Sequence, residues 1–325
     1  MSARSDKLVL ALPSKGRLQE QVNAYLADAG LKVKQSAGAR DYRASLVGER
    51  GIDVKLMSSA EIAGALGAGE IHLGVTGEDL LREDVADQSA IMLLQSLGFG
   101  FADVVVAVPR AWIDVANMAD LDDVCTAFHT RHHRRLRVAT KYVTLTRGFF
   151  AAHGIADYRI VESLGATEGA PAAGLAEAIV DITTTGATLT ANDLKILDDG
   201  VLLKSQAQLA ASVKAKWSAG ALAAAERLTA RIAARELART TYVLRFEPPR
   251  GIEKALAVLE KAEGCRVLTR EKDELALLCP REALSNVVAF LRGKGVRSAL
   301  AAEPADYVFT GGNPLMAKLQ AALKD

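Results

Sequence analysis

The run from 178 to 190 carries the residues best suited to chemistry. It reads AIVDITTTGATLT, an apolar stretch that ends in Asp181 and passes through hydroxyl side chains and Gly186 before a helix begins. Loop N–H groups and a helix N-terminus favour a bound phosphate, and a glycine lets the backbone close around it. Asp181 can accept hydrogen bonds from sugar hydroxyls, and three side chains can add donors: Thr184, Thr185 and Thr188. The pattern predicts a ribose 5-phosphate site; the alternative is a Thr-rich helix cap without a ligand.

Basic side chains follow two other apolar runs. Lys15 lies in the turn that follows the run 8–12, and Arg17 comes just after that turn. Lys141 follows the run 136–139. The carboxyl ends of strands are where α/β folds bind ligands. An arginine fork and a lysine point charge there could meet a polyphosphate, although taken alone a solvated surface explains Lys15 and Arg17 better.

Several polar residues have a simpler interpretation. Thr76, after the run 71–75, is explained equally well as a helix N-cap, and Arg40 as a solvated arginine. Three histidines lie among arginines, where positive charge disfavours a metal site, and we expect a solvated loop: His129, His132 and His133. The cysteines form no C-x-x-C pair and are expected to be reduced and buried: Cys125, Cys265 and Cys279.

Strands that alternate with helices must position these residues. One helix is predicted after the turn 13–16, with a C-cap at Gly30, and two others over 59–67 and 144–153. Apolar runs predict strands at 8–12, 53–57, 71–75, 103–108, 136–139, 158–161 and 178–182. The alternation indicates an α/β architecture with largely parallel sheets.

The last third of the chain has a different pattern. Residues 205–239 are rich in alanine and predict one long helix or two shorter ones. Further on, TYVLRF, a helical 252–263, RVLTR, ELALLC, a helical 281–293 and a final DYVF predict a βαββαβ unit of the ferredoxin-like kind. This unit is expected to be a separate C-terminal domain.

Composition narrows the class of protein. The 325 residues include 40 basic and 39 acidic side chains, a net charge of +1, which argues against a broad nucleic-acid or membrane footprint. The apolar run near the N-terminus is only 8–12, closed by Pro13, too short for a signal sequence or a spanning helix. We therefore expect a cytoplasmic protein.

Five segments together resemble ATP phosphoribosyltransferase, the first enzyme of histidine biosynthesis. They cover most of residues 7–200, in order: LPSKGRL (12–18), IHLGVTGEDLLRE (71–83), LGFGFADVVVAVP (97–109), RVATKYVTLTRGFFAAHGI (137–155) and GATEGAPAAGLAEAIVDITTTGATLTAN (165–192). The resemblance implies a glycosyltransferase that moves the 5-phosphoribosyl group of phosphoribosyl pyrophosphate (PRPP) to N1 of ATP, giving phosphoribosyl-ATP and pyrophosphate. It also implies a requirement for Mg2+, bound mainly by substrate.

Roles for individual residues follow from the resemblance. Glu168 and Asp181 would hold the ribose hydroxyls. The 5-phosphate would lie on Thr183, Thr184, Thr185, Gly186, Ala187 and Thr188. Lys15 and Arg17 would be the catalytic residues and would contact ATP together with Arg40, Thr76, Gly77 and Lys141.

The implied fold is a two-lobed α/β core of the periplasmic-binding-protein type (type II), followed by a small α+β ferredoxin-like, ACT-like domain. One lobe would take residues 1–103 and 196–238, the second 104–195, and the C-terminal regulatory domain 239–325. A homo-oligomer, dimer or hexamer, is expected, with histidine and AMP as allosteric or competing inhibitors. The sequence departs from the family at 57–62, where MSSAEI replaces an R-A-R-D-I-P run.

Two other functions stay open at this stage. A solute-binding or sensor protein would share the lobes, because fold alone does not decide function. A phosphoribosyltransferase with an acceptor other than ATP would share the ribose site.

Overall fold

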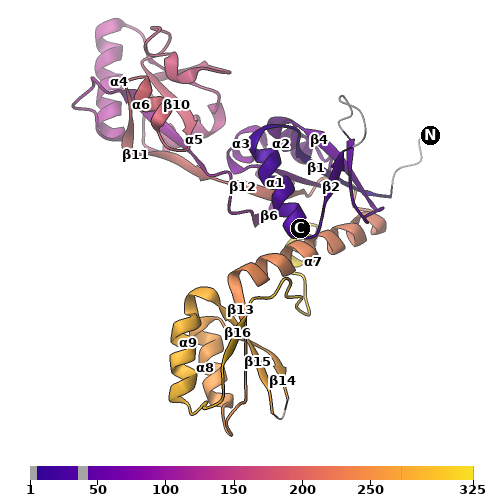
Figure 1. Cartoon of the computed structure of the whole chain (residues 1–325). Coiled ribbons are helices and arrows are strands. Elements are labelled where there is room, and N and C mark those ends of the chain that lie inside the picture. Colours follow the sequence, from indigo (N-terminus) through magenta and orange to yellow (C-terminus); the bar gives the residue numbers. More distant parts are fainter. Residues whose placement is uncertain (1–5, 36–42, 272, 325) are drawn as a thin grey trace. The chain divides into compact units, whose positions relative to one another are not determined.

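The computed structural model describes residues 6–35, 43–271 and 273–324. Contacts divide the chain into two compact units. The first contains the residues up to Tyr25, Lys32–Leu222 and those from Lys318 onward, and the second contains Leu26–Leu31 and Ala223–Ala317. Figure 1 shows the helices and strands of each.

Two sheets form the first unit. The larger has seven strands in the order β2-β3-β4-β1-β5-β12-β6. Their bounds are β1 Leu8–Pro13, β2 Val33–Gln35, β3 Arg43–Leu46, β4 Ile52–Met57, β5 Leu73–Gly77, β6 Ile91–Ser96 and β12 Ala207–Ser212. The helices between these strands are α1 Gly16–Asp28, α2 Ser59–Ala68, α3 Glu78–Asp84 and the short η1 Gln88–Ala90. We call this sheet and its helices the first lobe.

The second sheet has five strands in the order β11-β7-β10-β8-β9. They are β7 Ala102–Pro109, β8 Leu136–Thr140, β9 Tyr158–Glu162, β10 Ala178–Thr183 and β11 Leu194–Ser205. The accompanying helices are α4 Met118–His132, α5 Val143–Ala152, η2 Thr167–Gly169 and α6 Ala187–Ala191. These elements are the second lobe, and its core packs strand residues such as Val104 and Val180 against Tyr142 and Phe150, which are fully buried.

The two sheets share one topology. Read from β4, the first runs β4-β1-β5-β12-β6, and read from β9 the second runs β9-β8-β10-β7-β11. In each, three parallel strands are followed by one antiparallel strand that the chain adds after crossing from the other sheet, β12 in the first and β7 in the second. The chain therefore crosses between the lobes twice, and the predicted two-lobed core of the periplasmic-binding-protein type is confirmed.

The second unit contains most of α7 Ala219–Thr240 and a four-stranded sheet. Its strands β13 Thr241–Phe246, β14 Arg266–Arg270, β15 Leu275–Pro280 and β16 Ala301–Glu303 lie in the order β14-β15-β13-β16. The helices α8 Glu253–Glu263 and α9 Leu284–Gly293, the latter preceded by η3 Arg281–Ala283, pack on this sheet around Leu244, Leu259 and Leu291. This is the predicted βαββαβ order of a ferredoxin-like domain. A last helix, α10 Pro314–Ala322, follows.

Two predicted elements are wrong. Residues 205–218 are not helical: β12 inserts between β5 and β6, and all six of its residues are buried. Tertiary pairing here overrides the helix propensity of alanine. The final strand is also not DYVF but Ala301–Glu303, which pairs with β13, whereas Val308 packs against Ala238 and Leu278.

Within the described ranges, no helix is both long and apolar enough to cross a membrane.

Candidate active site

The strand ends of the two lobes bring the candidate segments to equivalent positions. The turn with Lys15 follows β1, Gly77 ends β5, Lys141 follows β8, and Asp181 lies near the end of β10. These are the two central parallel strands of each sheet. Their carboxyl ends are the places where an α/β sheet presents loops and helix starts to a ligand.

The loop after β10 is closed by its own hydroxyls. The Gly186 N–H donates to Thr183 Oγ1 at 2.8 Å, and Gly186 has a φ of 72°, which an L side chain rarely adopts. Thr184, Thr185 and Thr188 are exposed, so their hydroxyls are open to a ligand. The helix that follows, α6, has only five residues. A helix of this length contributes little to anion binding, so the predicted phosphate site depends on the N–H groups and hydroxyls of the loop.

Asp181, Glu168 and Lys141 form one electrostatic group. Burial raises the pKa of Asp181; the Ile182 N–H, which donates to Asp181 Oδ1 at 2.8 Å, and the Lys141 charge oppose that rise, whereas Glu168 adds to it. Glu168 is partly buried on η2. Two carboxylates and a lysine are thus close enough to influence one another at the end of β10.

A stability prediction follows from this burial. A buried carboxylate whose pKa is raised in the folded state binds its proton more tightly there than in the unfolded chain, so its ionisation at neutral pH destabilises the fold. Asp181→Asn should raise the melting temperature at neutral pH. The gain should shrink as the pH falls through the raised pKa of Asp181 and vanish below the ordinary value of 3.8, because wild-type Asp181 is then protonated in both states. Thermal unfolding across pH measures this, with exposed Asp123→Asn as the matched control expected to show no such trend. A lower melting temperature for Asp181→Asn at neutral pH would contradict it.

A pocket of about 550 Å³ collects residues from both lobes. Three of the predicted site residues line it: Arg17, Gly77 and Thr184. Residues without a role predicted from sequence line it too, among them Gln21, Asp79, Phe99 and Phe101. Phe101 is 58% exposed although it is a large aromatic side chain. The signal that could have indicated this part of the pocket is the LGFGF segment, whose glycines, Gly98 and Gly100, both have positive φ.

The other predicted nucleotide contacts are placed as follows. Lys15 is exposed in the turn after β1, and Arg40 lies outside the described residues. Thr76 is fully buried and donates its hydroxyl to the Ser59 carbonyl at 2.9 Å. The N-cap of α3 is Gly77, which makes no side-chain cap bond, so the N-cap interpretation of Thr76 is wrong. A Cβ at Gly77 would overlap the Asp79 carboxylate, which explains the glycine.

The residues MSSAEI at 57–62, where the sequence departs from the R-A-R-D-I-P run of the family, form the start of a helix. Ser58 is the N-cap of α2, and its side chain accepts from the Glu61 N–H at 3.3 Å. The Ser58 N–H donates in turn to Glu61 Oε2 at 2.8 Å, which completes a capping box. Serine and glutamate at these positions start a helix, and they supply none of the positive charge of an arginine.

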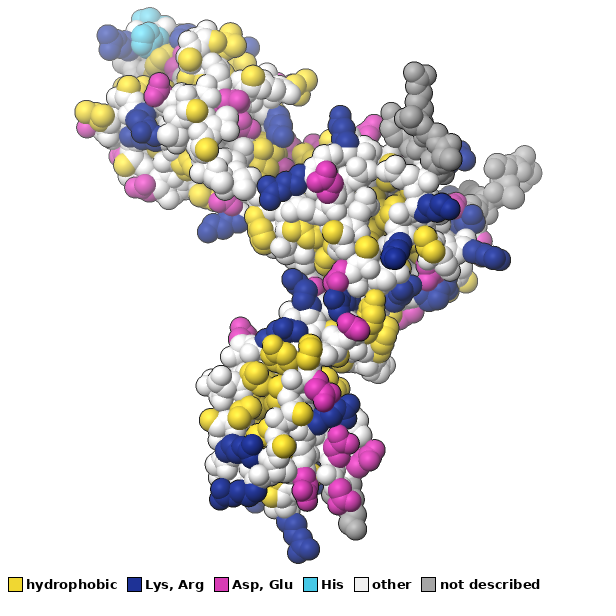
Figure 2. Space-filling view, viewed as in Figure 1, with side chains coloured by type: hydrophobic (Ala, Val, Ile, Leu, Met, Phe, Trp, Pro, Cys, Tyr) yellow, Lys and Arg dark blue, Asp and Glu magenta, His cyan; other side chains and the backbone are white. Residues whose placement is uncertain are grey.

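The histidine-rich segment is predicted from sequence to be a loop, but in the structure it forms the end of α4. Met118, Leu121 and Cys125 bury one face of this helix, and His133 caps it in the left-handed conformation. His129 Nδ1 lies 3.0 Å from Asp157 Oδ1, and His132 packs on Phe128. Figure 2 shows histidine side chains beside basic ones in this region. In the part of the chain that the structure describes, no group of three or more His, Cys, Asp or Glu could hold a metal ion.

All three cysteines are free and buried, as predicted.

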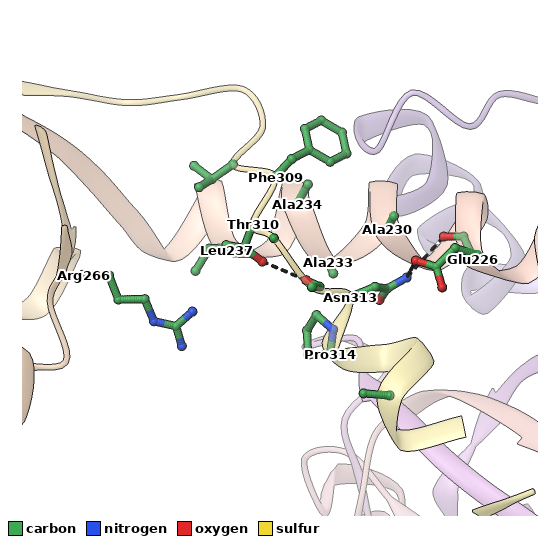
Figure 3. Close-up of a pocket in the computed structure, with 14 residues that line it drawn as sticks. Glu226, Ala230, Ala233, Ala234, Leu237, Arg266, Phe309, Thr310, Asn313 and Pro314 are labelled. Carbon is green, nitrogen blue, oxygen red and sulfur yellow. Dashed lines mark hydrogen bonds between the residues drawn. The ribbon is translucent and has the colours of Figure 1, made fainter. Parts of the chain in front are cut away.

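A second cavity, of about 630 Å³, lies within the second unit and contains none of the predicted site residues. One face of α7 and residues 308–317 line it. Asn313 Nδ2 donates to Glu226 Oε1 at 3.0 Å and to Thr229 Oγ1 at 2.8 Å. Figure 3 shows Arg266 on the opposite side of this cavity from Glu226 and Asn313. Although this cavity is larger, the predicted site residues that line a cavity, Arg17, Gly77 and Thr184, line the pocket of about 550 Å³.

The chain is similar in sequence to known proteins over nearly its whole length. The family described as ATP phosphoribosyltransferase matches residues 58–234. The chain is 52% identical to an ATP phosphoribosyltransferase of Rhodopseudomonas palustris (strain BisA53), over 98% of this chain and 99% of that protein. It is also 52% identical to one of Bradyrhizobium diazoefficiens, over the same shares. Among solved structures, the ATP phosphoribosyl transferase (HisG:HisZ) complex from Thermotoga maritima is 26% identical, covers 63% of this chain and 87% of that chain, and has a TM-score of 0.49.

Proposed function

The chain belongs to the ATP phosphoribosyltransferase family, and we propose that the strand ends of its two lobes divide the two substrates between them. It is a transferase that catalyses the first step of histidine biosynthesis from ATP and PRPP. The observation that carries the proposal is the convergence of the ends of β1, β5 and β10, with Arg17, Gly77 and Thr184 in one pocket. The bond from Tyr142 to Asp79 brings the turn after β8 to the same lobe boundary.

The second lobe holds the sugar donor in this proposal. The carboxylates of Asp181 and Glu168 accept hydrogen bonds from the ribose hydroxyls, which are stronger to a charged acceptor than to a neutral one. The loop supplies N–H and hydroxyl donors to the 5-phosphate from Thr183, Thr184, Thr185, Gly186, Ala187 and Thr188. The bond from the Gly186 N–H to Thr183 Oγ1 supports this role, because it fixes the shape of the loop before the ligand binds and leaves the Thr183 hydroxyl hydrogen free to donate.

The first lobe, with Lys141, holds ATP. Arg17, in the first turn of α1, lines the pocket and can bind phosphate oxygens as a fork, with exposed Lys15 beside it as a point charge. Gly77 allows close approach of the nucleotide, and Arg40 completes the proposed set. Thr76, predicted with them, is fully buried and its hydroxyl is bonded to the Ser59 carbonyl, so it supports Gly77 rather than contacting the nucleotide.

The chemistry needs no nucleophilic side chain. The lone pair of adenine N1 forms the new bond to C1 of the ribose, and the bond from C1 to the pyrophosphate oxygen breaks, with its electron pair leaving on pyrophosphate. Positioning and electrostatic stabilisation must therefore provide the rate. Mg2+, when bound, neutralises the leaving pyrophosphate; it would be held mainly by substrate oxygens, with Glu168 and Asp181 as the protein carboxylates of the donor site.

The lobes have a further proposed task. We infer that residues 1–103 with 196–238 and residues 104–195 act as two catalytic lobes whose closure excludes water from the sugar donor, and that 239–325 is a regulatory domain. We place the enzyme in the cytoplasm as a homo-oligomer, a dimer or hexamer, without nucleic acid or membrane partners.

Product formation tests the proposed function. Purified protein is mixed with ATP, PRPP, Mg2+ and pyrophosphatase, and the product is identified by absorbance and mass. Phosphoribosyl-ATP is the expected product. Turnover of PRPP with another base but not with ATP would instead support a different acceptor, and PRPP binding without turnover would support a solute-binding function.

Feedback inhibition is the second part of the proposal. AMP, which shares adenosine and phosphate with ATP, should compete with ATP. Histidine should bind the second unit, whose cavity offers an acid at Glu226 and a base at Arg266 for a zwitterion. We expect millimolar histidine to inhibit the enzyme, and Arg266→Ala to weaken that inhibition roughly tenfold, as expected for one lost charged contact. Exposed Arg297→Ala is the matched control. If millimolar histidine leaves the rate unchanged, inhibition by histidine is ruled out.

A further inference from the structure

Helix α3 of the first lobe bonds one turn of the second lobe at two points. The Tyr142 hydroxyl donates to Asp79 Oδ2 at 2.8 Å. One helical turn along, the Glu83 carboxylate accepts from the Thr144 N–H at 2.8 Å and the Leu145 N–H at 3.0 Å, in the first turn of α5. Residues four apart share a helix face, so both carboxylates are directed at the 141–145 turn.

Asp79 is held on its other side by the strand that leaves the second lobe. Its N–H donates to Ser205 Oγ at 3.0 Å, and the Ser205 hydroxyl donates back to Asp79 Oδ1 at 2.9 Å. Ser205 ends β11, just before the chain crosses to β12. Asp79 is only 7% exposed, and a buried carboxylate is costly unless its oxygens are bonded. Both oxygens are bonded here, so Asp79 links the crossing strand to the 141–145 turn.

The 141–145 turn is itself rigid. Tyr142 is fully buried; its N–H donates to Thr140 Oγ1 at 2.8 Å, and its carbonyl accepts from the Thr146 hydroxyl at 2.5 Å. Lys141 precedes it, with Nζ 4.8 Å from the centre of the Tyr142 ring. Burial raises the pKa of Asp181, and the Lys141 charge acts against that rise, which places the ammonium within electrostatic reach of the proposed ribose carboxylate. Any movement of Tyr142 therefore moves Lys141.

We propose that Asp79, Glu83 and Tyr142 form a joint that fixes the 141–145 turn against the first lobe and so holds Lys141 beside the ribose site, which makes Tyr142 a positioning residue for the transfer. The inference rests on the proposed role of Lys141. The joint also connects the lobes at the point where the chain crosses between them, so the position of α3 sets the position of Lys141.

A double-mutant cycle tests the joint. Tyr142→Phe removes one oxygen and keeps the buried ring, and kcat and KM are measured for both substrates in the wild-type and Lys141→Ala backgrounds. Loss of a hydrogen bond to a charged acceptor predicts a drop of about tenfold or more in kcat/KM for ATP, the substrate that Lys141 is proposed to bind. In the Lys141→Ala background the same substitution should change kcat/KM less than about twofold, because its effect passes through Lys141. Tyr158→Phe is the matched control and should match wild type. Tyr158 lies beside the first residue of β8, whereas Tyr142 follows the last residue of that strand.

The outcomes separate the joint from the proposed site. An impaired Lys141→Ala enzyme on which Tyr142→Phe acts with full, additive effect overturns the joint but leaves Lys141 in place. A fully active Lys141→Ala enzyme overturns the proposed role of Lys141, and the joint with it. If Tyr142→Phe does not fold, Glu83→Gln replaces it, because the amide keeps one acceptor oxygen and loses the charge. A loss for Glu83→Gln that persists in the Lys141→Ala background also overturns the proposal.

Discussion

Replacing Asp181 with alanine should lower kcat/KM for PRPP by roughly 100- to 1,000-fold, because hydrogen bonds from substrate hydroxyls to a charged carboxylate contribute about 1.5–3 kcal/mol each. The loss should fall on PRPP rather than on ATP, since Asp181 lies at the end of β10, where the proposed donor site is. Steady-state kinetics with each substrate varied in turn measure it.

Controls make this prediction specific to the site. Asp123→Ala removes the same side chain from an exposed position on α4 of the same lobe and should leave both kinetic constants unchanged. Glu168→Ala should act in the same direction as Asp181→Ala, because both carboxylates are proposed to hold the ribose hydroxyls. An Asp181→Ala enzyme with unchanged kcat/KM for PRPP would falsify the placement of the ribose.

Arg17→Ala should lower kcat/KM for ATP about 10- to 100-fold, the range expected for the loss of charge-assisted bonds to phosphate. Arg17 lines the pocket that also contains Thr184, so its guanidinium is placed to meet phosphate oxygens between the two sites. Arg17→Lys should recover part of the loss, since a lysine keeps the charge but not the planar fork. Exposed Arg110→Ala is the matched control. If Arg17→Ala and Arg110→Ala behave alike, Arg17 is a solvated residue, which is the alternative that the sequence left open.

Sequence correctly predicted where candidate residues lie on strands and turns when that placement depends only on neighbouring residues. A strand, a turn and the start of a helix occupy consecutive residues, so the pattern of apolar and polar side chains places Lys15 after β1 and Asp181 on β10 without knowledge of the tertiary fold. The βαββαβ order of the second unit was predictable for the same reason, with the exception of its last strand.

The features that could not be predicted from sequence depend on contacts between residues that are far apart in the chain. Ala207–Ser212 resembles a helix by composition, and only its pairing with β5 and β6 makes it a strand. The bond between Asp79 and Tyr142 joins residues 63 positions apart, and that between Asp79 and Ser205 spans 126. No local pattern reports such contacts.

Thr76 shows the same limit at a single residue. Its place after an apolar run is equally consistent with a cap, a ligand contact or a buried strand position. The structure shows the strand position, with the hydroxyl bonded to Ser59 on α2, because β5 continues through Gly77. A hydroxyl near a strand end is therefore a weak predictor of a ligand contact.

The most direct test of the central claim is a crystal structure of the wild-type protein with PRPP bound. The account predicts the 5-phosphate inside the loop of residues 183–188 and the ribose hydroxyls on Glu168 and Asp181, with the pyrophosphate facing Arg17. A 5-phosphate bound away from that loop, with Glu168 and Asp181 making no contact to the sugar, would contradict it.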